Sequence, residues 1–181
     1  MEPTATTDET TVLQQLSALW PTLTAKQRQL LSEHIVIRTY EKHEIIHMEE
    51  DNASQLYYLL DGKVKIYKEG VGGRSQIVRM AKPQGFFGYR AGFADDVYST
   101  SASAFETTTL GIIPVSVMKD IIKENNDVAV YFLRQLATLL RHADEQTVNL
   151  TQKHIRGRLA ESLLHLKEQY GTDVNTGVLN I

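Results

Sequence analysis

Residues 56–67 of the chain read LYYLLDGKVKIY, and residues 85–92 read GFFGYRAG. The first stretch predicts two β-strands on either side of Asp61-Gly62, because Asp-Gly between alternating apolar residues is the strongest short-range hairpin signal. The second stretch predicts a glycine-rich turn whose backbone can approach an anion closely. Together the two stretches indicate a strand-rich domain with a candidate binding turn.

Short strand patterns continue on both sides of these two stretches. Between His34 and Ile113, segments rich in β-branched and aromatic residues alternate with turn residues. They lie at residues 35–37, 45–46, 56–60, 64–66, 76–78 and 109–113, and residues 69–74 predict a hairpin tip. Many short strands at this spacing are typical of a jelly roll, so we expect an α+β fold built around an antiparallel β-roll.

Helical patterns flank the predicted roll. Two short helices are predicted at residues 12–20 and 24–33, the second with Thr24 as its cap, and a third at 115–124 follows Pro114. A long helix is expected to begin with Asp127 as its cap, and its apolar or small residues recur in alternating steps of four and three. These positions are Ala129, Leu133, Leu136, Leu140, Ala143, Thr147 and Leu150.

This apolar seam has two interpretations. Its spacing is that of a dimerisation helix, with Leu133, Leu136, Leu140 and Ala143 at the interface. A helix packed only on its own β-roll would show a similar stripe. A second apolar face beside the seam favours a helix that packs on the roll with one face and on a second copy with the other. We therefore expect a homodimer.

Composition limits the class of protein. The 181 residues are 42% apolar and 23% charged, with a net charge of −3, which is typical of a globular protein and unlike a free-standing nucleic-acid binder. The absence of cysteine excludes disulfides and cysteine-ligated iron–sulfur clusters. No apolar run approaches the ~20 residues that cross a membrane, and no signal peptide opens the chain. We expect a cytoplasmic protein without a membrane partner.

A last helix is predicted from Gln152 to Tyr170, with Gly171 after its end, and within it residues 157–166 read GRLAESLLHL. This run, the strand with Asp61-Gly62, the turn at 85–88 and the long helix together resemble the CRP/FNR family of bacterial transcription regulators. The resemblance implies a cyclic nucleotide-binding-like sensor domain at 1–126, a dimerisation helix at 127–151 and the start of a winged helix-turn-helix domain at 152–181. It implies that the recognition helix follows Ile181, so that this last domain is truncated.

The resemblance places the effector pocket at the turn that follows residue 85. The candidate pocket residues are Gly88, Tyr89, Arg90, Tyr98, Ser99 and Thr100. In members that bind cyclic AMP, a glutamate holds the ribose, and the corresponding residue here is Tyr89. An arginine–serine pair holds the cyclic phosphate in those members, and the corresponding residues here are Tyr98 and Ser99. The purine-contacting Thr-Ser pair of such members corresponds to Ala143 and Asp144. Without the arginine, we expect no binding of cyclic AMP in the usual way.

Several alternatives for this pocket stay open at the level of sequence. Arg90 could replace the missing cation and hold a cyclic nucleotide, another small anion or oxygenated metabolite could bind, or the tyrosines could fill a vestigial site. A haem-based gas sensor is a further alternative, since the chain has six histidines. We expect His43 and His47 on one strand face and His142 in the dimer helix near the pocket, although single histidines are more often structural.

Enzyme signatures are incomplete in this sequence. A metal-dependent cupin shares the β-roll but needs two histidines and a glutamate in its first motif and another histidine near Gly88, and this set is not present. There is also no nucleophile elbow, P-loop or Rossmann fingerprint. We expect neither catalytic residues nor a metal site.

The predicted function is therefore that of an effector-responsive DNA-binding regulator that acts allosterically through its dimer helix. The resemblance implies DNA binding through a domain largely C-terminal to this chain, and RNA polymerase as a partner. Lys153, Arg156 and Arg158 are candidates for contacts with DNA phosphates, or else they form a solvated helix face. A cyclic-nucleotide domain that controls something other than DNA is the rival, and the run at 157–166 argues against it. The effector stays unidentified.

Overall fold

The computed structural model describes residues 9–70, 72–152, 156–157, 159–160, 163–164, 167, 171–173, 176 and 178–179. The chain forms two compact units, residues 1–131 and 132–181, which are described separately below. The boundary falls inside the long helix, so the predicted three-part division at residues 126 and 151 stays a prediction.

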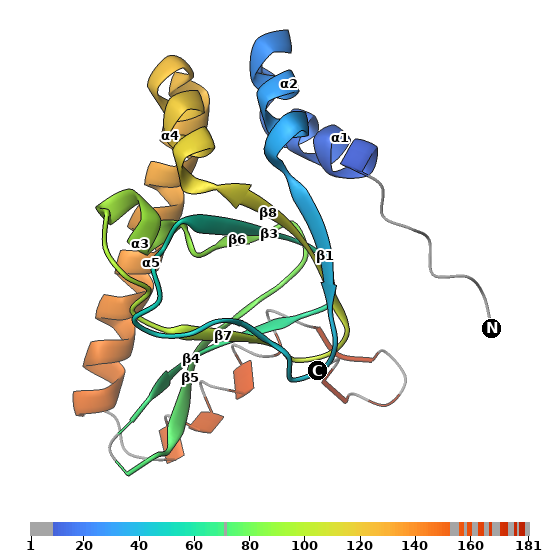
Figure 1. Cartoon of the computed structure of the whole chain (residues 1–181). Coiled ribbons are helices and arrows are strands. Elements are labelled where there is room, and N and C mark those ends of the chain that lie inside the picture. Colours follow the sequence, from blue (N-terminus) through green and yellow to red (C-terminus); the bar gives the residue numbers. More distant parts are fainter. Residues whose placement is uncertain are drawn as a thin grey trace, which may run out of the picture. The chain divides into compact units, whose positions relative to one another are not determined.

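Two four-stranded antiparallel sheets form the centre of the first unit (Figure 1). One sheet has the order β1-β8-β3-β6, and the other has the order β2-β7-β4-β5. The strands are β1 (Val36–Tyr40), β2 (Ile45–His47), β3 (Gln55–Asp61), β4 (Val64–Glu69), β5 (Ser75–Ala81), β6 (Phe86–Phe87), β7 (Ser101–Ala104) and β8 (Thr108–Pro114). Because the chain passes repeatedly from one sheet to the other, the expected α+β jelly roll is confirmed.

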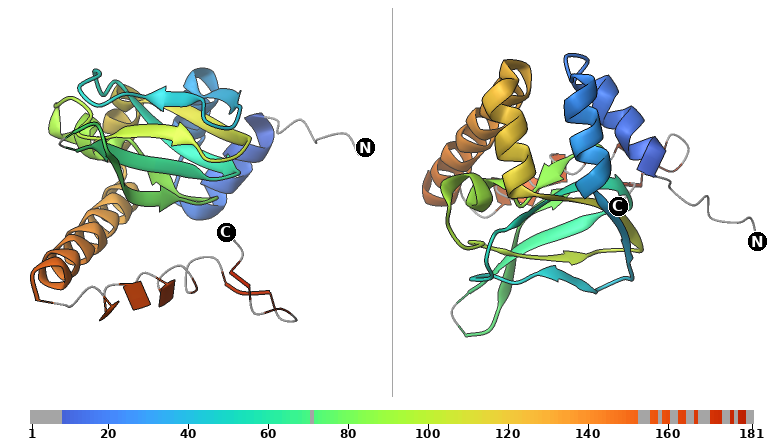
Figure 2. Two further views of the ribbon diagram at one scale, coloured as in Figure 1. Left: turned by 90° about the horizontal axis from the view of Figure 1, so that it is seen from below. Right: turned by 45° about the horizontal axis from the view of Figure 1, so that its top comes forward.

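Five helices accompany the strands in the described part of the chain. They are α1 (Glu9–Leu19), α2 (Ala25–His34), α3 (Tyr89–Ala94), α4 (Val115–Glu124) and α5 (Asn126–Gln152). Helices α1, α2 and α4 lie on one side of the sheets (Figures 1 and 2). The predicted cap of α2 is confirmed, since the Thr24 hydroxyl accepts a hydrogen bond from the Gln27 amide and the Gln27 side chain accepts one from the Thr24 amide.

The expected cap of α5 is wrong by two residues. The Asn125 side-chain oxygen, not Asp127, accepts the first free amides of the helix, those of Asp127 at 3.2 Å and Val128 at 3.3 Å. Asn125 is buried, and its side-chain nitrogen also donates to Gln27 on α2. Asn125 is held by contacts with α2, whereas Asp127 stays exposed. Tertiary contacts therefore decide which polar residue caps the helix.

The core of the roll lies between the two sheets and includes residues from both. Its buried members are Tyr40, Ala53, Tyr57, Leu59, Val64, Ile66, Phe87, Tyr98, Ala102, Ala104 and Leu110. The predicted turn residue Tyr98 is thus part of the core.

The hairpin predicted around Asp61-Gly62 is wrong, although the turn itself is present. Strand β3 pairs with β6 and β8, whereas β4 pairs with β5 and β7, so the turn is a corner between the sheets. This corner packs against the one between β7 and β8: a Cβ on Gly62 would lie 2.5 Å from the Thr107 carbonyl oxygen. The hairpin predicted at residues 69–74 is confirmed as the β4–β5 connection.

In the second unit, α5 continues to Gln152, and helical backbone recurs at residues 156–157, 159–160, 163–164 and 167. Much of the predicted helix at 152–170 lies outside the described residues. The Gly171 amide donates to the Lys167 carbonyl with Gly171 at φ +71°, as expected of a residue that ends a helix.

We predict that Gly62→Ala lowers the free energy of unfolding by about 2–4 kcal/mol. Alanine is unfavourable in the left-handed conformation of this residue, and its methyl group would clash with the Thr107 carbonyl. The control is Gly72→Ala, at φ +79° with no atom within 4 Å of the added carbon, which should cost about 1 kcal/mol. Urea denaturation monitored by circular dichroism measures both variants. Equal losses would refute the packed corner.

Candidate functional site

The predicted effector turn, residues 88–100, contains a short helix that the sequence did not indicate. Gly88 precedes α3 at φ +82°, and a Cβ there would lie 3.0 Å from the Tyr57 ring and 3.2 Å from the Gln55 carbonyl. Glycine is therefore needed both for its backbone angle and for the close approach to β3. The turn is thereby held against the first sheet.

Tyr89 points into the protein and has a charged environment. It is 2% exposed, and the Arg79 guanidinium of β5 forms a hydrogen bond with its side chain. Burial raises the pKa of Tyr89, while the nearby positive charges of Arg79 and Arg90 oppose that rise. The Phe93 ring lies 5.9 Å from the Tyr89 ring. The residue predicted to correspond to the ribose-binding glutamate is thus a buried phenol.

Tyr98 fills the interior of the roll. It is 4% exposed, its hydroxyl donates to the Gln55 carbonyl at 2.5 Å, and a further hydrogen bond links it to the Tyr57 side chain. The His47 ring stacks on it with a centroid distance of 3.9 Å. A cyclic phosphate at this position would meet a neutral, already bonded side chain, so these residues do not fit the usual cyclic AMP contact.

The remaining predicted pocket residues lie at the surface or near it. Ser99 and Arg90 are exposed and Thr100 is half-buried. The Ser99 carbonyl accepts a hydrogen bond from Lys68, which also pairs with Glu49. The six residues therefore do not share one environment: Tyr89 lies next to Arg79, whereas Tyr98 lies among aromatic rings.

Arg79 is a residue of this site that the sequence analysis missed. It is the only charged residue in β5, and it is half-buried next to Tyr89. A single charge within a strand is a weak signal, since most such charges point to solvent.

The four histidines that the structure describes do not form the arrangement expected for a haem ligand. His43 lies in a turn at φ +72° and is exposed, whereas His47 is buried in β2, so the expected shared strand face is wrong. His47 lies between the rings of Tyr98 and Tyr57, which would have to move before it could bind iron. His142 Nδ1 lies 3.4 Å from the Glu145 carboxylate. No group of three or more metal-binding side chains occurs among the described residues.

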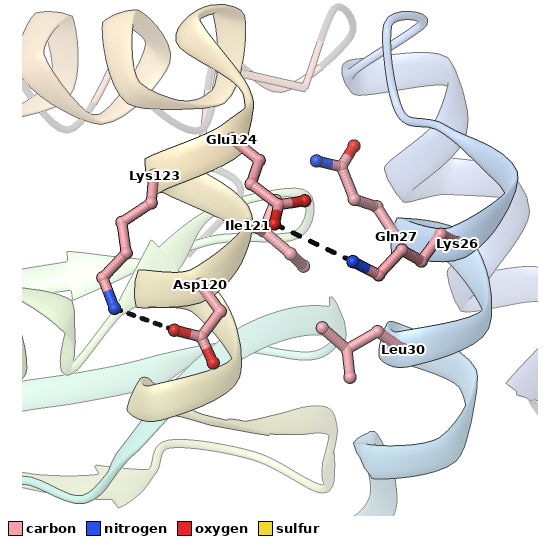
Figure 3. A pocket seen from close by; sticks show the side chains of 7 residues that line it. All are labelled: Lys26, Gln27, Leu30, Asp120, Ile121, Lys123 and Glu124. Atoms are coloured by element: carbon pink, nitrogen blue, oxygen red, sulfur yellow. Dashed lines mark hydrogen bonds and ion pairs between the residues drawn. The ribbon is translucent and has the colours of Figure 1, made fainter.

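A hollow of about 290 Å³ lies elsewhere, between α2 and α4 (Figure 3). Leu30 and Ile121 contribute its apolar wall. Its charged side chains are paired with each other, Lys26 with Glu124 at 3.8 Å and Lys123 with Asp120 at 2.9 Å. Because these charges already have partners, the hollow is a poor candidate for an effector site.

The dimer-interface residues predicted on α5 differ in exposure. Leu133 is 62% exposed and Leu140 is 65% exposed, while Leu136 is half-buried and Ala143 is exposed. Of the predicted phosphate-contacting residues, Arg156 is exposed, and Lys153 and Arg158 lie outside the described residues. Among the helices that the structure describes, none has the length and apolarity needed to cross a membrane.

Burial lowers the pKa of His47 to about 4, against opposing effects of the Met48 backbone and the Asp51 carboxylate. The folded-state pKa is thus below the unfolded value of about 6.5, so the unfolded chain binds the extra proton between these values. The stability that neutral His47 contributes is complete above pH 6.5 and is lost as the pH falls towards 4.

Between pH 7 and pH 5, the wild-type protein should lose about 2 kcal/mol of its free energy of unfolding through His47 alone. We therefore predict that His47→Phe, which keeps a ring at this position, does not show this loss. Urea denaturation at the two pH values measures the difference. The exposed His34, replaced in His34→Gln, is the control and should leave the wild-type pH dependence in place. An unchanged pH dependence in His47→Phe would show that this ring is not buried as described.

Comparison with known proteins agrees with this architecture. Residues 37–125 match the cyclic nucleotide-binding domain family. The chain is 32% identical over 130 residues to the cAMP-activated global transcriptional regulator CRP of Haemophilus influenzae, an alignment that covers 71% of this chain and 57% of that protein. This chain therefore spans little more than half the length of that relative.

Solved structures give the same result. The structure of FixK2 from Bradyrhizobium japonicum has a TM-score of 0.68 at 26% identity, covering 78% of this chain and 69% of that one. The Thermus thermophilus catabolite activator protein has a TM-score of 0.64 at 27% identity, and the match covers 83% of this chain and 71% of that one. In sequence and in fold, the chain belongs to the CRP/FNR family.

Proposed function

We propose that this chain is the effector-sensing and dimerising part of a DNA-binding transcription regulator that does not bind cyclic AMP in the usual way. The observation that supports the second half of this proposal is that Tyr98, the predicted counterpart of the phosphate-binding arginine, is buried and hydrogen-bonded. A tyrosine carries no positive charge and cannot form the two parallel hydrogen bonds that arginine forms with a phosphate.

The ring contacts of the first unit provide a route from the effector turn to the long helix. Tyr131, in the first turns of α5, makes edge contacts with Trp20 at 5.5 Å and with Phe86 at 6.0 Å. Phe86 belongs to β6, directly before the effector turn. An effector that moves this turn would therefore act on packed rings at the start of α5, which is the kind of discrete contact that transmits a conformational change.

The exposed leucines of α5 support a homodimer. Leu133 and Leu140 are seven residues apart and lie on one face of the helix, and both are mostly exposed. A second copy of the same helix is the partner with a matching apolar face. An allosteric change at α5 would then set the spacing of two DNA-binding domains, with Lys153, Arg156 and Arg158 near DNA phosphates.

The remaining parts of the proposal follow from the family. The protein would act in the cytoplasm, contact RNA polymerase and carry out no chemical reaction. The matched relative is named a cAMP-activated regulator, and its activation by cyclic AMP is the property that we do not transfer to this chain.

We predict that Leu140→Glu gives a monomer in sedimentation velocity, because a carboxylate in a desolvated seam opposes its symmetry mate. Expressed from its native gene, the variant should also lose occupancy at promoter DNA in immunoprecipitation. Thr138→Glu, an exposed position outside the seam, is the control and should stay dimeric and DNA-bound. A dimeric Leu140→Glu would refute the seam, and a wild type that occupies no specific DNA would refute the regulator function.

A thermal-unfolding titration tests the ligand half of the proposal. A ligand at 100 times its dissociation constant adds about 2.7 kcal/mol to stability, which raises Tm by several degrees. We expect no shift with cyclic AMP. A clear shift would contradict our interpretation of Tyr98 and would restore a nucleotide sensor that uses another cation.

A further inference from the structure

A β-bulge determines where Arg79 points. Strand β4 pairs Tyr67 with Ile77 but Ile66 with Arg79, so Val78 is an extra residue on β5. Cross-strand partners share one face of a sheet, and Ile66 is 3% exposed on the inner face. The bulge therefore directs the Arg79 side chain into the roll. Bulges are frequent beside functional sites because they redirect a side chain in this way.

The charge that the bulge brings inward has no acidic partner within the part of the chain that the structure describes. Among the described residues, neither Arg79 nor Arg90 forms an ion pair with a carboxylate, although most buried or half-buried charges in proteins do so. Burial lowers the pKa of Arg79, and the neighbouring positive charge of Arg90 lowers it further. A half-buried guanidinium with a second positive charge near it, and with no carboxylate partner, is unfavourable unless an anion lies with it.

We propose that Arg79 and Arg90 form an anion-binding centre, and that the effector is a small dianion with carboxylate or phosphate groups held by these two guanidinium groups. The proposal rests on the function proposed above and specifies the chemical class of its effector. Two positive charges match a dianion, and a planar guanidinium can bind a carboxylate or a phosphate through two parallel hydrogen bonds. Neutral and cationic effectors do not fit this centre.

Tyr89 connects the centre to the long helix. Its side chain is hydrogen-bonded to Arg79 in the absence of a ligand. An anion that engages Arg79 would compete for this hydrogen bond, because it is a stronger acceptor than a phenol. Tyr89 follows Phe86 of β6 by three residues, the Phe86 ring lies 6.0 Å from that of Tyr131 on α5, and Tyr131 contacts the single tryptophan, Trp20. Trp20 is therefore a natural reporter of an event at this centre.

Trp20 fluorescence, titrated with sodium phosphate and with sodium succinate at constant ionic strength, tests the proposal. Sodium chloride is the reference for salt effects. We expect a saturable change with at least one of the two dianions and none with chloride, and the more effective probe distinguishes a phosphate from a carboxylate ligand. The absence of a saturable response to both probes would overturn the anion centre.

Matched variants locate the response. Arg90→Gln, at an exposed position, should weaken binding about tenfold or more, as should Arg79→Lys, which keeps a charge but loses the planar fork. Arg74→Gln, at the exposed end of the same hairpin, should not change binding. Wild-type affinity in Arg90→Gln would overturn the proposal even if Arg79 variants do not fold. If the protein dimerises and occupies promoter DNA but shows no response to either dianion, only the proposed anion-binding centre is refuted and the proposed function stands.

Discussion

The space between the two sheets must be filled at the density of a protein interior, and much of this structure depends on how that requirement is met. Tyr57, Phe87 and Tyr98 occupy the centre, with His47 stacked on Tyr98. Packed interiors leave few voids larger than a water molecule. A side chain that fills the roll is therefore removed from ligand binding, and Tyr98 is such a side chain.

The same packing pairs the Tyr98 hydroxyl with groups inside the core. The Tyr98 hydroxyl donates to the Gln55 carbonyl, and a hydrogen bond joins it to Tyr57. Buried hydroxyls that are already satisfied give no net gain when a ligand replaces their partner. Available charge near the turn comes instead from Arg79 and Arg90, where Tyr89 is the protein partner of Arg79. The structure thus separates a filled aromatic cluster from a neighbouring positive one.

The position of these clusters relative to α5 supports the response that we propose. Trp20, Phe86 and Tyr131 come from three separate parts of the chain and pack as one group of rings. Phe86 leads into the effector turn, and Tyr131 belongs to the helix that continues into the second unit. Rings packed in this way have few alternative arrangements, which is why we propose that they couple the turn to the helix.

Local patterns in the sequence were sufficient to predict the roll, helix α4 at Val115–Glu124 and the Thr24 cap of α2. Turn residues, periodicity and capping depend on neighbouring residues, so they can be recognised without the tertiary structure. That Tyr98 replaces the arginine of the usual phosphate site stays a prediction from the sequence. Only the tertiary structure decided that Asp61-Gly62 is a corner between sheets, since strand pairing depends on distant partners. It likewise decided that Asn125 starts α5, and that the bulge at Val78 turns Arg79 inward, because the inner face of an edge strand is defined by its register with a neighbour.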